Sequence, residues 1–445
     1  MSREGAVPSK PGREARRALF ANRNFRWLLG GGALSMLGDQ FTLLALPWLV
    51  LKLSGDPLVL GTVLAMLSLP RAVFILIGGA LVDRHSPYNV LLLTKYLNAA
   101  LLGLLAALVW SGAVTLWMIY GLAAAIGVVT AFSFPAGSSI LPQALPAQAL
   151  HAANGVLMGL RQAMVLIGPL LAGGLIAHFG DAASAHPIAA PSSASGLALA
   201  FALDAASFAI SAWTLWQVQP TVRVNKAAPQ PVLRAVGEAL GAMWQDHELR
   251  ALCLYFGAIA FFVGGPLQVA LPVLANTQLP GGAVALGQLL AGHGLGALLG
   301  MVLAGALPRW RLKTLGLTVL AIDATAGLTF LPFGHISAAW QGVALLAPLG
   351  ALAGFVQVAV FTWMQRRVPP AMLGRAMSLF MFIFMGLSPV AAAAAGAALR
   401  VLTPAALFTA SGASLVGIVL LGATLTPIRR ITDLPAEAPA DAVSA

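Results

Sequence analysis

The feature that most constrains this chain is a succession of apolar runs, each about 20 residues or longer, which is the length a helix needs to cross the hydrocarbon of a bilayer. Of its 445 residues, 59% are hydrophobic and only 9% are charged, whereas soluble domains carry about 25% charged residues. The runs are continuously apolar rather than alternating, which favours helices over a β-barrel. We therefore predict an all-α polytopic membrane protein.

Twelve runs qualify as transmembrane helices, six on each side of a polar connector. They cover residues 26–51, 58–82, 88–110, 113–135, 152–178, 197–217, 251–275, 283–307, 312–333, 338–363, 376–399 and 403–426. We expect Pro135 and Pro142 to mark the end of the fourth helix.

Five segments follow from these runs: a basic leader (1–24), a first six-helix bundle (25–217), the connector (218–250), a second six-helix bundle (251–427) and a tail (428–445). Within the connector, Leu233, Val236 and Leu240 share one face of an amphipathic helix that is expected to lie at the membrane surface.

The two bundles carry a weak internal repeat. Gly168-Pro169 has a counterpart at Ser388-Pro389, and Gly79-Ala80-Leu81 has one at Gly305-Ala306-Leu307, each about 220 residues later. Because each unit holds an even number of helices, both insert with the same orientation, as in parallel repeats about an axis along the membrane normal. Function is expected where the two pseudo-repeat bundles meet.

The placement of the charges argues against nucleic-acid binding despite a formal net charge of +11. When alternate loops are assigned to one side, that side takes all but four of the 25 Lys and Arg residues, Lys95 included. Lys52 and Arg400 lie near the opposite face, and Arg71 and Arg161 lie inside helices. By the positive-inside rule, both termini are cytoplasmic.

Asp39 lies about halfway along the first predicted helix. A carboxylate at this depth is costly unless it faces the bundle interior or a watery cavity, so Asp39 is a functional candidate. A structural ion pair with Arg71 of the second helix, at a similar depth, is an equally open interpretation.

Other polar residues at membrane depth are interpreted as structural. His293 and Asp323 lie at depths that allow a pair, and a satisfied buried His is favoured over a proton relay. The lone Cys253 is expected to serve packing. No catalytic constellation, metal-ligand spacing or phosphate loop is present, so we expect neither an enzyme, nor a cofactor, nor ATP drive. A sensor would be expected to add a soluble signalling domain.

The turn Gly79-x-Leu81-x-Asp83-Arg84, together with the twelve helices and the central connector, resembles the major facilitator superfamily over residues 20–427. The resemblance implies a conformational latch, in which Asp83 faces the start of the eleventh helix beside Arg375. Ser86, Pro87 and Tyr88 depart from the usual pattern, where glycine and basic residues are common.

Leu37-Gly38-Asp39, Pro70-Arg71 and Leu203-Asp204 resemble the bacterial macrolide and siderophore efflux subgroup. The segment Gly168, Pro169 and Gly173 resembles the helix-bending motif of antiporters, although Met164 replaces a usual glycine, and simple packing remains open for it. The resemblance implies an antiporter of the bacterial inner membrane that exports drug- or siderophore-like small molecules in exchange for protons.

Such an exporter would confer drug resistance, act as a monomer and work by alternating access. Import, facilitated transport and lysophospholipid flipping remain alternatives within the same fold, because helices alone do not define direction.

The resemblance also suggests roles for individual residues. Asp39 would exchange the proton, with Arg71 or Arg161 as its switching partner, whereas Asp204 and Asp323 fall on peripheral helices and are expected to be structural. The cavity lining is expected to be mainly apolar and aromatic, with core packing open for each aromatic residue. Its candidates are Gln40, Phe132, Phe134, Gln268, Gln357, Phe361 and Trp363.

Overall fold

The structure is a computed structural model that describes residues 17–84, 86–179, 195–219, 247–307, 312–367 and 386–432, with single residues 241, 244 and 310. The first half of the chain forms six long helices. They are α2 (Arg23–Ser54), α3 (Pro57–Arg84), α4 (Pro87–Trp110), α5 (Leu116–Ala144), α6 (Ala147–Phe179) and α7 (Ser195–Trp216).

The second half repeats this arrangement with more interruptions. Its first crossing consists of α9 (His247–Gly265), the π-helical turn η2 (Pro266–Ala270) and α10 (Leu271–Thr277). The others are α11 (Ala283–Ala306), α12 (Leu315–Phe330), α13 (Ala339–Arg367), the helix Gly386–Ala398 and α15 (Pro404–Leu425), with short 3₁₀ turns η3 (Phe333–His335) and η4 (Pro427–Arg430).

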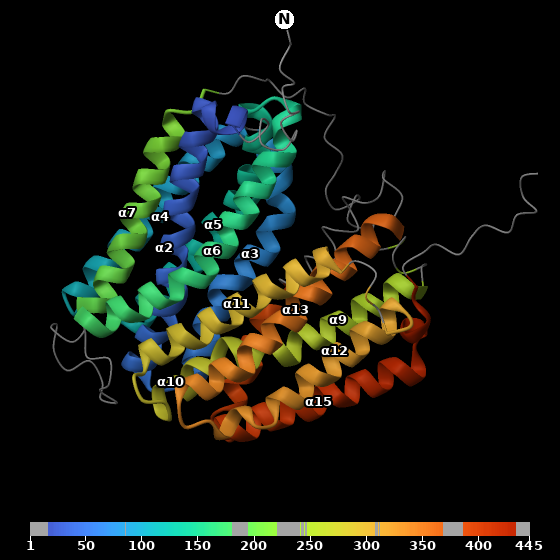
Figure 1. The fold of residues 1–445 in the computed structure, drawn as a ribbon. Helices are drawn as coiled ribbons and strands as arrows, with labels where there is room; N and C mark the ends of the chain where they lie inside the picture. Colours follow the sequence, from blue (N-terminus) through green and yellow to red (C-terminus); the bar gives the residue numbers. More distant parts are fainter. Residues whose placement is uncertain are drawn as a thin grey trace, which may run out of the picture.

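Within the described residues, eleven helices are long and apolar enough to cross a membrane, and Gly386–Ala398 is a shorter apolar helix. The prediction of twelve helices in two bundles is confirmed (Figure 1). The amphipathic connector helix lies outside the described residues and stays a prediction.

The predicted end of the fourth helix was wrong. α5 continues through Pro135 and Pro142 to Ala144. Prolines are tolerated inside membrane helices because neighbouring groups satisfy the freed backbone carbonyls. In α5, Pro135 frees the carbonyl of Ala131 and Pro142 frees that of Ser138, each four residues earlier in the helix.

Several helix starts are set by side-chain caps. Asn22 accepts the N–H of Phe25, and Thr115, Thr314 and Thr403 make the same type of bond at the starts of α5, α12 and α15. Such caps satisfy N–H groups that have no partner within the helix. The turn after α2 uses Gly55, whose φ of 63° is readily adopted only by glycine.

Glycines allow the helices of each half to pack closely, as is usual in membranes. A Cβ on Gly31 of α2 would lie 2.0 Å from the Thr214 hydroxyl of α7, and one on Gly127 of α5 would lie 2.2 Å from the Leu67 carbonyl of α3. In the second half, Gly296 of α11 packs on the backbone of α13. Small residues thus fix the helix pairs within each bundle.

The two halves meet toward one face of the molecule. We call the face where α2 ends and α3 begins the far face, and the face where α2 begins and α15 ends the terminal face. Near the far face, a Cβ on Gly61 would lie 2.5 Å from the Ala392 carbonyl, and one on Gly173 would lie 2.7 Å from the Ala283 carbonyl. Only residues without bulky side chains allow these approaches.

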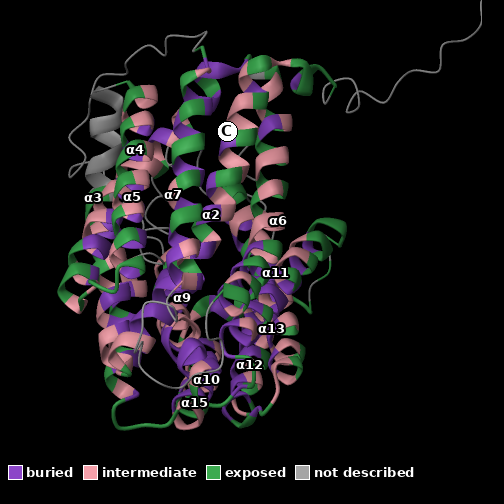
Figure 2. Cartoon of the chain, turned by 90° about the vertical axis from the view of Figure 1, so that its left-hand side faces the viewer, coloured by how far each residue is buried: buried purple, intermediate pink, exposed green. Residues whose placement is uncertain are grey.

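The apolar core follows the same division. The largest cluster of buried residues includes both halves, with Leu44 and Leu49 of α2 joined to Leu271 and Leu274 of α10. Smaller clusters that contain Leu141 and Trp363 belong to one half each. The bundles therefore share a core near the far face and diverge toward the terminal face (Figures 1 and 2).

Candidate functional site

A group of charged side chains lies at mid-membrane depth inside the first half. Asp39, Arg71 and Arg161 each lie near the middle of their helices, α2, α3 and α6. Asp39 and Arg161 are exposed, and Arg71 is half-buried. Arg71, Arg161 and Lys95 of α4 are the cations close enough to interact electrostatically with Asp39. Three helices thus direct positive charge at one carboxylate.

No direct bond holds these three groups in the described part of the chain. Asp39 forms no ion pair there within 4.0 Å, and the same is true of Arg71 and Arg161. The Nε atom of Arg71 is buried without a hydrogen-bond partner. Because unpaired charge is costly in a membrane interior, this arrangement suits groups that exchange partners rather than a fixed structural bridge.

A hydrogen-bonded network borders the charged group. Lys95 donates to the Ser35 hydroxyl at 2.9 Å and lies over the Phe208 ring, 5.1 Å from its centroid. Asp204 of α7 is buried and accepts hydrogen bonds from Thr42 and Ser207. Both Lys95 and Asp204 interact electrostatically with Asp39. The site is therefore one cluster of five ionisable groups, which we call the mid-membrane cluster.

Gly38 allows this network to form. A Cβ at this position would lie 2.2 Å from the Ser207 hydroxyl and 2.3 Å from the Asp204 carboxylate. Since any larger residue would displace both groups, Gly38 lets α2 approach α7 and brings Asp204 into the cluster.

The sequence indicated part of this cluster. Asp39 and Arg71 were predicted to lie at a similar depth, with Arg71 or Arg161 as the switching partner of Asp39, and both arginines interact electrostatically with Asp39 in the structure. Lys95 was counted among the basic residues of the loops on one side of the membrane, but it lies within α4 beside Ser35. Its spacing from buried Leu91, Thr94 and Asn98 along α4 was the signal that could have identified it.

The second half holds no such group among its described residues. Asp323 is buried and accepts a hydrogen bond from the Tyr255 hydroxyl at 2.7 Å. Asp323 and His293 form no ion pair within the described residues, and the expectation of a fully satisfied His293 was wrong, because its buried Nδ1 has no hydrogen-bond partner. The partner of Asp323 is therefore the Tyr255 hydroxyl of α9.

Other predicted site residues have varied surroundings. Gly79, Asp83 and Arg84 lie in the last turns of α3, whereas Arg375 lies outside the described residues. The latch therefore stays a prediction.

The glycine-proline segment of α6 lies at helix contacts. A Cβ on Gly168 would lie 2.4 Å from the Gln40 side chain, and one on Gly287 of α11 would lie 2.4 Å from the Pro169 carbonyl. With Gly173 near Ala283, this segment is part of the contact between the halves.

The cavity candidates have different surroundings, and their role in a common lining stays a prediction. Gln268 donates to the Ser388 hydroxyl at 2.9 Å, and buried Trp363 donates its indole N–H to the Thr432 carbonyl. Trp363 therefore packs in the core of the second half. The rest divide by exposure: Phe134 and Gln357 are exposed, while Gln40, Phe132 and Phe361 are half-buried.

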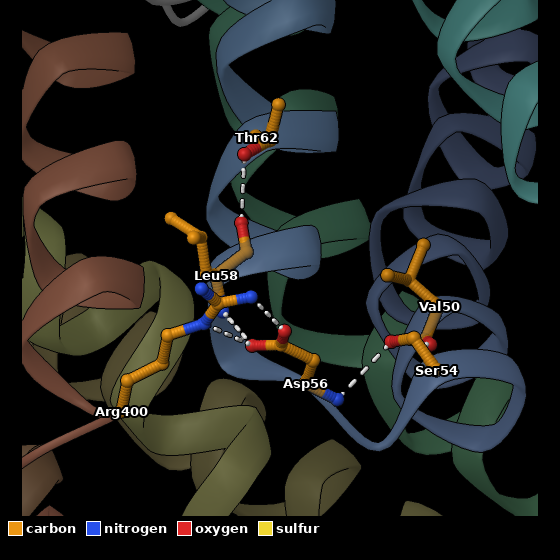
Figure 3. A network of polar contacts seen from close by, with 6 residues as sticks. All are labelled: Val50, Ser54, Asp56, Leu58, Thr62 and Arg400. Carbon is orange, nitrogen blue, oxygen red and sulfur yellow. Dashed lines mark hydrogen bonds and ion pairs between the residues drawn. The ribbon is translucent and has the colours of Figure 1, made fainter.

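An ion pair joins the two halves at the far face (Figure 3). The Arg400 guanidinium donates to both oxygens of Asp56, and Asp56 also accepts the N–H of Leu58 at the start of α3. The hydrogen bonds from Arg400, followed by that from Leu58, lower the pKa of the Asp56 carboxyl. The sequence did not indicate this pair, since its members are 344 positions apart.

No group of three or more His, Cys, Asp or Glu side chains that could hold a metal ion is found among the described residues. The ionisable groups of the mid-membrane cluster can instead exchange protons or bind charged groups.

Comparison with known proteins gives a consistent result. The sequence profile of the Major Facilitator Superfamily matches residues 28–393. An uncharacterised MFS-type transporter of Sinorhizobium fredii is 26% identical over 389 residues, covering 83% of this chain and 87% of the relative. Macrolide efflux protein A of Streptococcus pyogenes is 24% identical over 361 residues, covering 80% and 84%.

Among solved structures, a bacterial homologue of the iron transporter ferroportin in its inward-facing state has a similar fold. Its TM-score is 0.67 at 17% identity, over 90% of this chain and 99% of that one.

Proposed function

Because the chain belongs to the Major Facilitator Superfamily, we propose that it is a proton-coupled transporter that exports amphipathic small molecules. One observation carries the proposal: Asp39 is exposed at mid-membrane depth, faced by three cations and held by no direct bond among the described residues. Groups of this kind mark proton and substrate pathways in membranes.

In this proposal, Asp39 is the carboxylate that binds and releases the exchanged proton. A nearby cation favours its ionised form, whereas removal from water favours its protonated form. Movement of Arg71 or Arg161 toward or away from Asp39 would therefore bind or expel a proton. The arrival of a cationic compound would have the same effect as the arrival of an Arg.

Alternating access requires the halves to open on each face in turn. The contacts of Gly61, Gly173 and the Asp56–Arg400 pair hold the far face closed. Since basic loops mark the cytoplasmic side, the terminal face is the cytoplasmic one, and this arrangement corresponds to an inward-open state. The proposed latch between Asp83 and Arg375 would stabilise the opposite state.

Export is favoured by the relative named macrolide efflux protein A, since direction cannot be derived from helices. We place the protein as a monomer in the bacterial cytoplasmic membrane, with both termini cytoplasmic. Drug- and siderophore-like compounds are the expected classes.

Purified protein in liposomes with an acidic lumen tests this function. Outward proton flow should drive uptake of erythromycin, tetraphenylphosphonium or a hydroxamate siderophore, and a protonophore should abolish it. If the compounds equilibrate across the membrane to the same level with and without the proton gradient, the protein would be a facilitator. Movement of a labelled lysophospholipid without uptake of these compounds would indicate a flippase.

A further inference from the structure

Lys95 lies in the membrane interior without a direct ion pair. Its Nζ atom donates to the neutral Ser35 hydroxyl and lies over the Phe208 ring. Asp39 and Asp204 interact with it electrostatically, yet neither lies within 4.0 Å of its Nζ atom. An ammonium group has three hydrogen-bond donors, so the described side chains satisfy Lys95 only in part.

The helices packed against α4 define the charges around Lys95. α7 contributes Asp204, and α5 has no Asp, Glu, Lys, Arg or His. Asp39 of α2 faces the group, and Arg71 of α3 and Arg161 of α6 face Asp39. These five are the charged groups of the mid-membrane cluster.

The net charge of the mid-membrane cluster depends on the protonation of Lys95. Arginine stays protonated in proteins, whereas a buried lysine releases its proton readily. Two ionised aspartates balance Arg71 and Arg161, so the cluster is neutral only when Lys95 is neutral. With one further proton its net charge is +1, whether that proton lies on Lys95 or on Asp39.

We infer that Lys95 is a second proton-exchanging group of this cluster and shares the exchanged proton with Asp39. Coupled groups of this kind titrate as a unit rather than singly. The inference rests on the proposed function and names the group that lets the cluster reach neutrality.

The exchange step balances in charge. The cluster holds one proton and a net charge of +1 before a compound binds. A monovalent cationic compound that enters beside Asp39 would raise this to +2, and like charge disfavours a protonated lysine. The proton passes from the Lys95 ammonium to water at the terminal face, its N–H bonding electrons remain on nitrogen, and the net charge returns to +1.

Proton release on binding tests the inference. Purified wild-type protein in weakly buffered detergent is titrated with tetraphenylphosphonium, ethidium and erythromycin while a pH dye records released protons. Lys95→Arg keeps the charge but cannot release the proton, and Lys95→Gln is permanently uncharged. Arg430→Gln, at an exposed position outside the cluster, is the matched control, and thermal unfolding confirms that each variant is folded.

We expect wild type and Arg430→Gln to release protons, and both Lys95 variants to release clearly fewer protons per bound compound, because only Asp39 remains to exchange one. Lys95→Gln should still bind the cationic probe, with an affinity that varies less with pH than that of wild type. Wild-type release in Lys95→Arg, or unchanged pH dependence in folded Lys95→Gln, would overturn the inference. Absence of release from wild type with every compound would instead contradict the proposed function.

Discussion

The two halves place glutamines at equivalent positions but differ in the residue before them. In the first half, Gln40 of α2 packs against Gly168 of α6. In the second half, Gln268 of η2 bonds to Ser388, the repeat counterpart of Gly168. The preceding residue is Asp39 in the first half and Leu267 in the second. One architecture thus places a carboxylate before this glutamine in the first half and an apolar residue before it in the second.

The surroundings of the membrane-embedded carboxylates also differ between the two halves. Asp39 is exposed beside cations from α3, α4 and α6, whereas Asp323 in the second half is buried and bonded to Tyr255. A satisfied carboxylate stabilises a bundle, while one without a fixed partner can change state. We therefore propose that proton coupling resides in the first half and that Asp323 of the second half serves stability.

The largest effect on transport is expected when the carboxylate of Asp39 is moved to the equivalent position of the second half. Asp39→Leu should abolish gradient-driven transport, and the double variant Asp39→Leu with Leu267→Asp should not restore it. The cations that match the carboxylate remain on helices of the first half. Liposome uptake measures both variants, with thermal unfolding as the control for folding. Recovery of transport in the double variant would mean that the halves are interchangeable.

Closing the space beside Gly38 should have the next largest effect. The added methyl group of Gly38→Ala would collide with Ser207 and Asp204, and overpacking of this kind costs about 1–3 kcal/mol. We expect a lower Tm and reduced transport. Gly32→Ala is the matched control, since no atom lies within 4 Å of its Cβ position. Equal effects of the two substitutions would remove Gly38 from the site.

Removing the hydroxyl of Tyr255 should affect stability more than transport. Tyr255→Phe leaves buried Asp323 without its donor, at a cost of about 1–3 kcal/mol. Thermal unfolding should show a lower Tm, with transport retained once the protein is folded. Tyr120→Phe serves as the control, because its hydroxyl makes no hydrogen bond with the described residues. Loss of proton coupling in Tyr255→Phe would place part of the mechanism in the second half.

The smallest expected effect concerns the contact between the halves. Asp56→Asn should weaken the link to Arg400 and favour opening of the far face. Spin labels at exposed positions 117 and 401, introduced as cysteines in a Cys253→Ser background, report the distance across this face. We expect a larger population of long distances in Asp56→Asn than in its parent.

Acid should have the same effect on the parent protein. Since Arg400 lowers the pKa of Asp56, the pair is intact above the ordinary Asp value of about 3.9. It is lost only as the pH falls through the lowered pKa. An identical distance distribution in parent and variant at neutral pH would mean that the pair does not hold the face closed.

Much of this fold followed from the sequence, because a span of about 20 apolar residues has few structures available in lipid. Similar depth in the membrane also related Asp39 to Arg71, and Arg161 was expected as the alternative switching partner. Lys95 was missed because it lies nearer a helix end, where a basic residue is expected for topology. The continuation of α5 past Pro135 was missed because proline breaks helices in water.

The remaining contacts depend on how the two halves close. Arg400 lies 344 positions from Asp56, and the approach of Gly61 to Ala392 depends on the angle between the bundles. Neither the periodicity nor the composition of a single helix carries that information.

The most direct test of proton coupling in the first half uses everted membrane vesicles, energised so that the lumen is acidic. Addition of a transported compound should release protons from wild-type vesicles, and Asp39→Asn should abolish this release while the protein remains folded. Equal release from Asp39→Asn vesicles would contradict the account and reduce Asp39 to a structural residue.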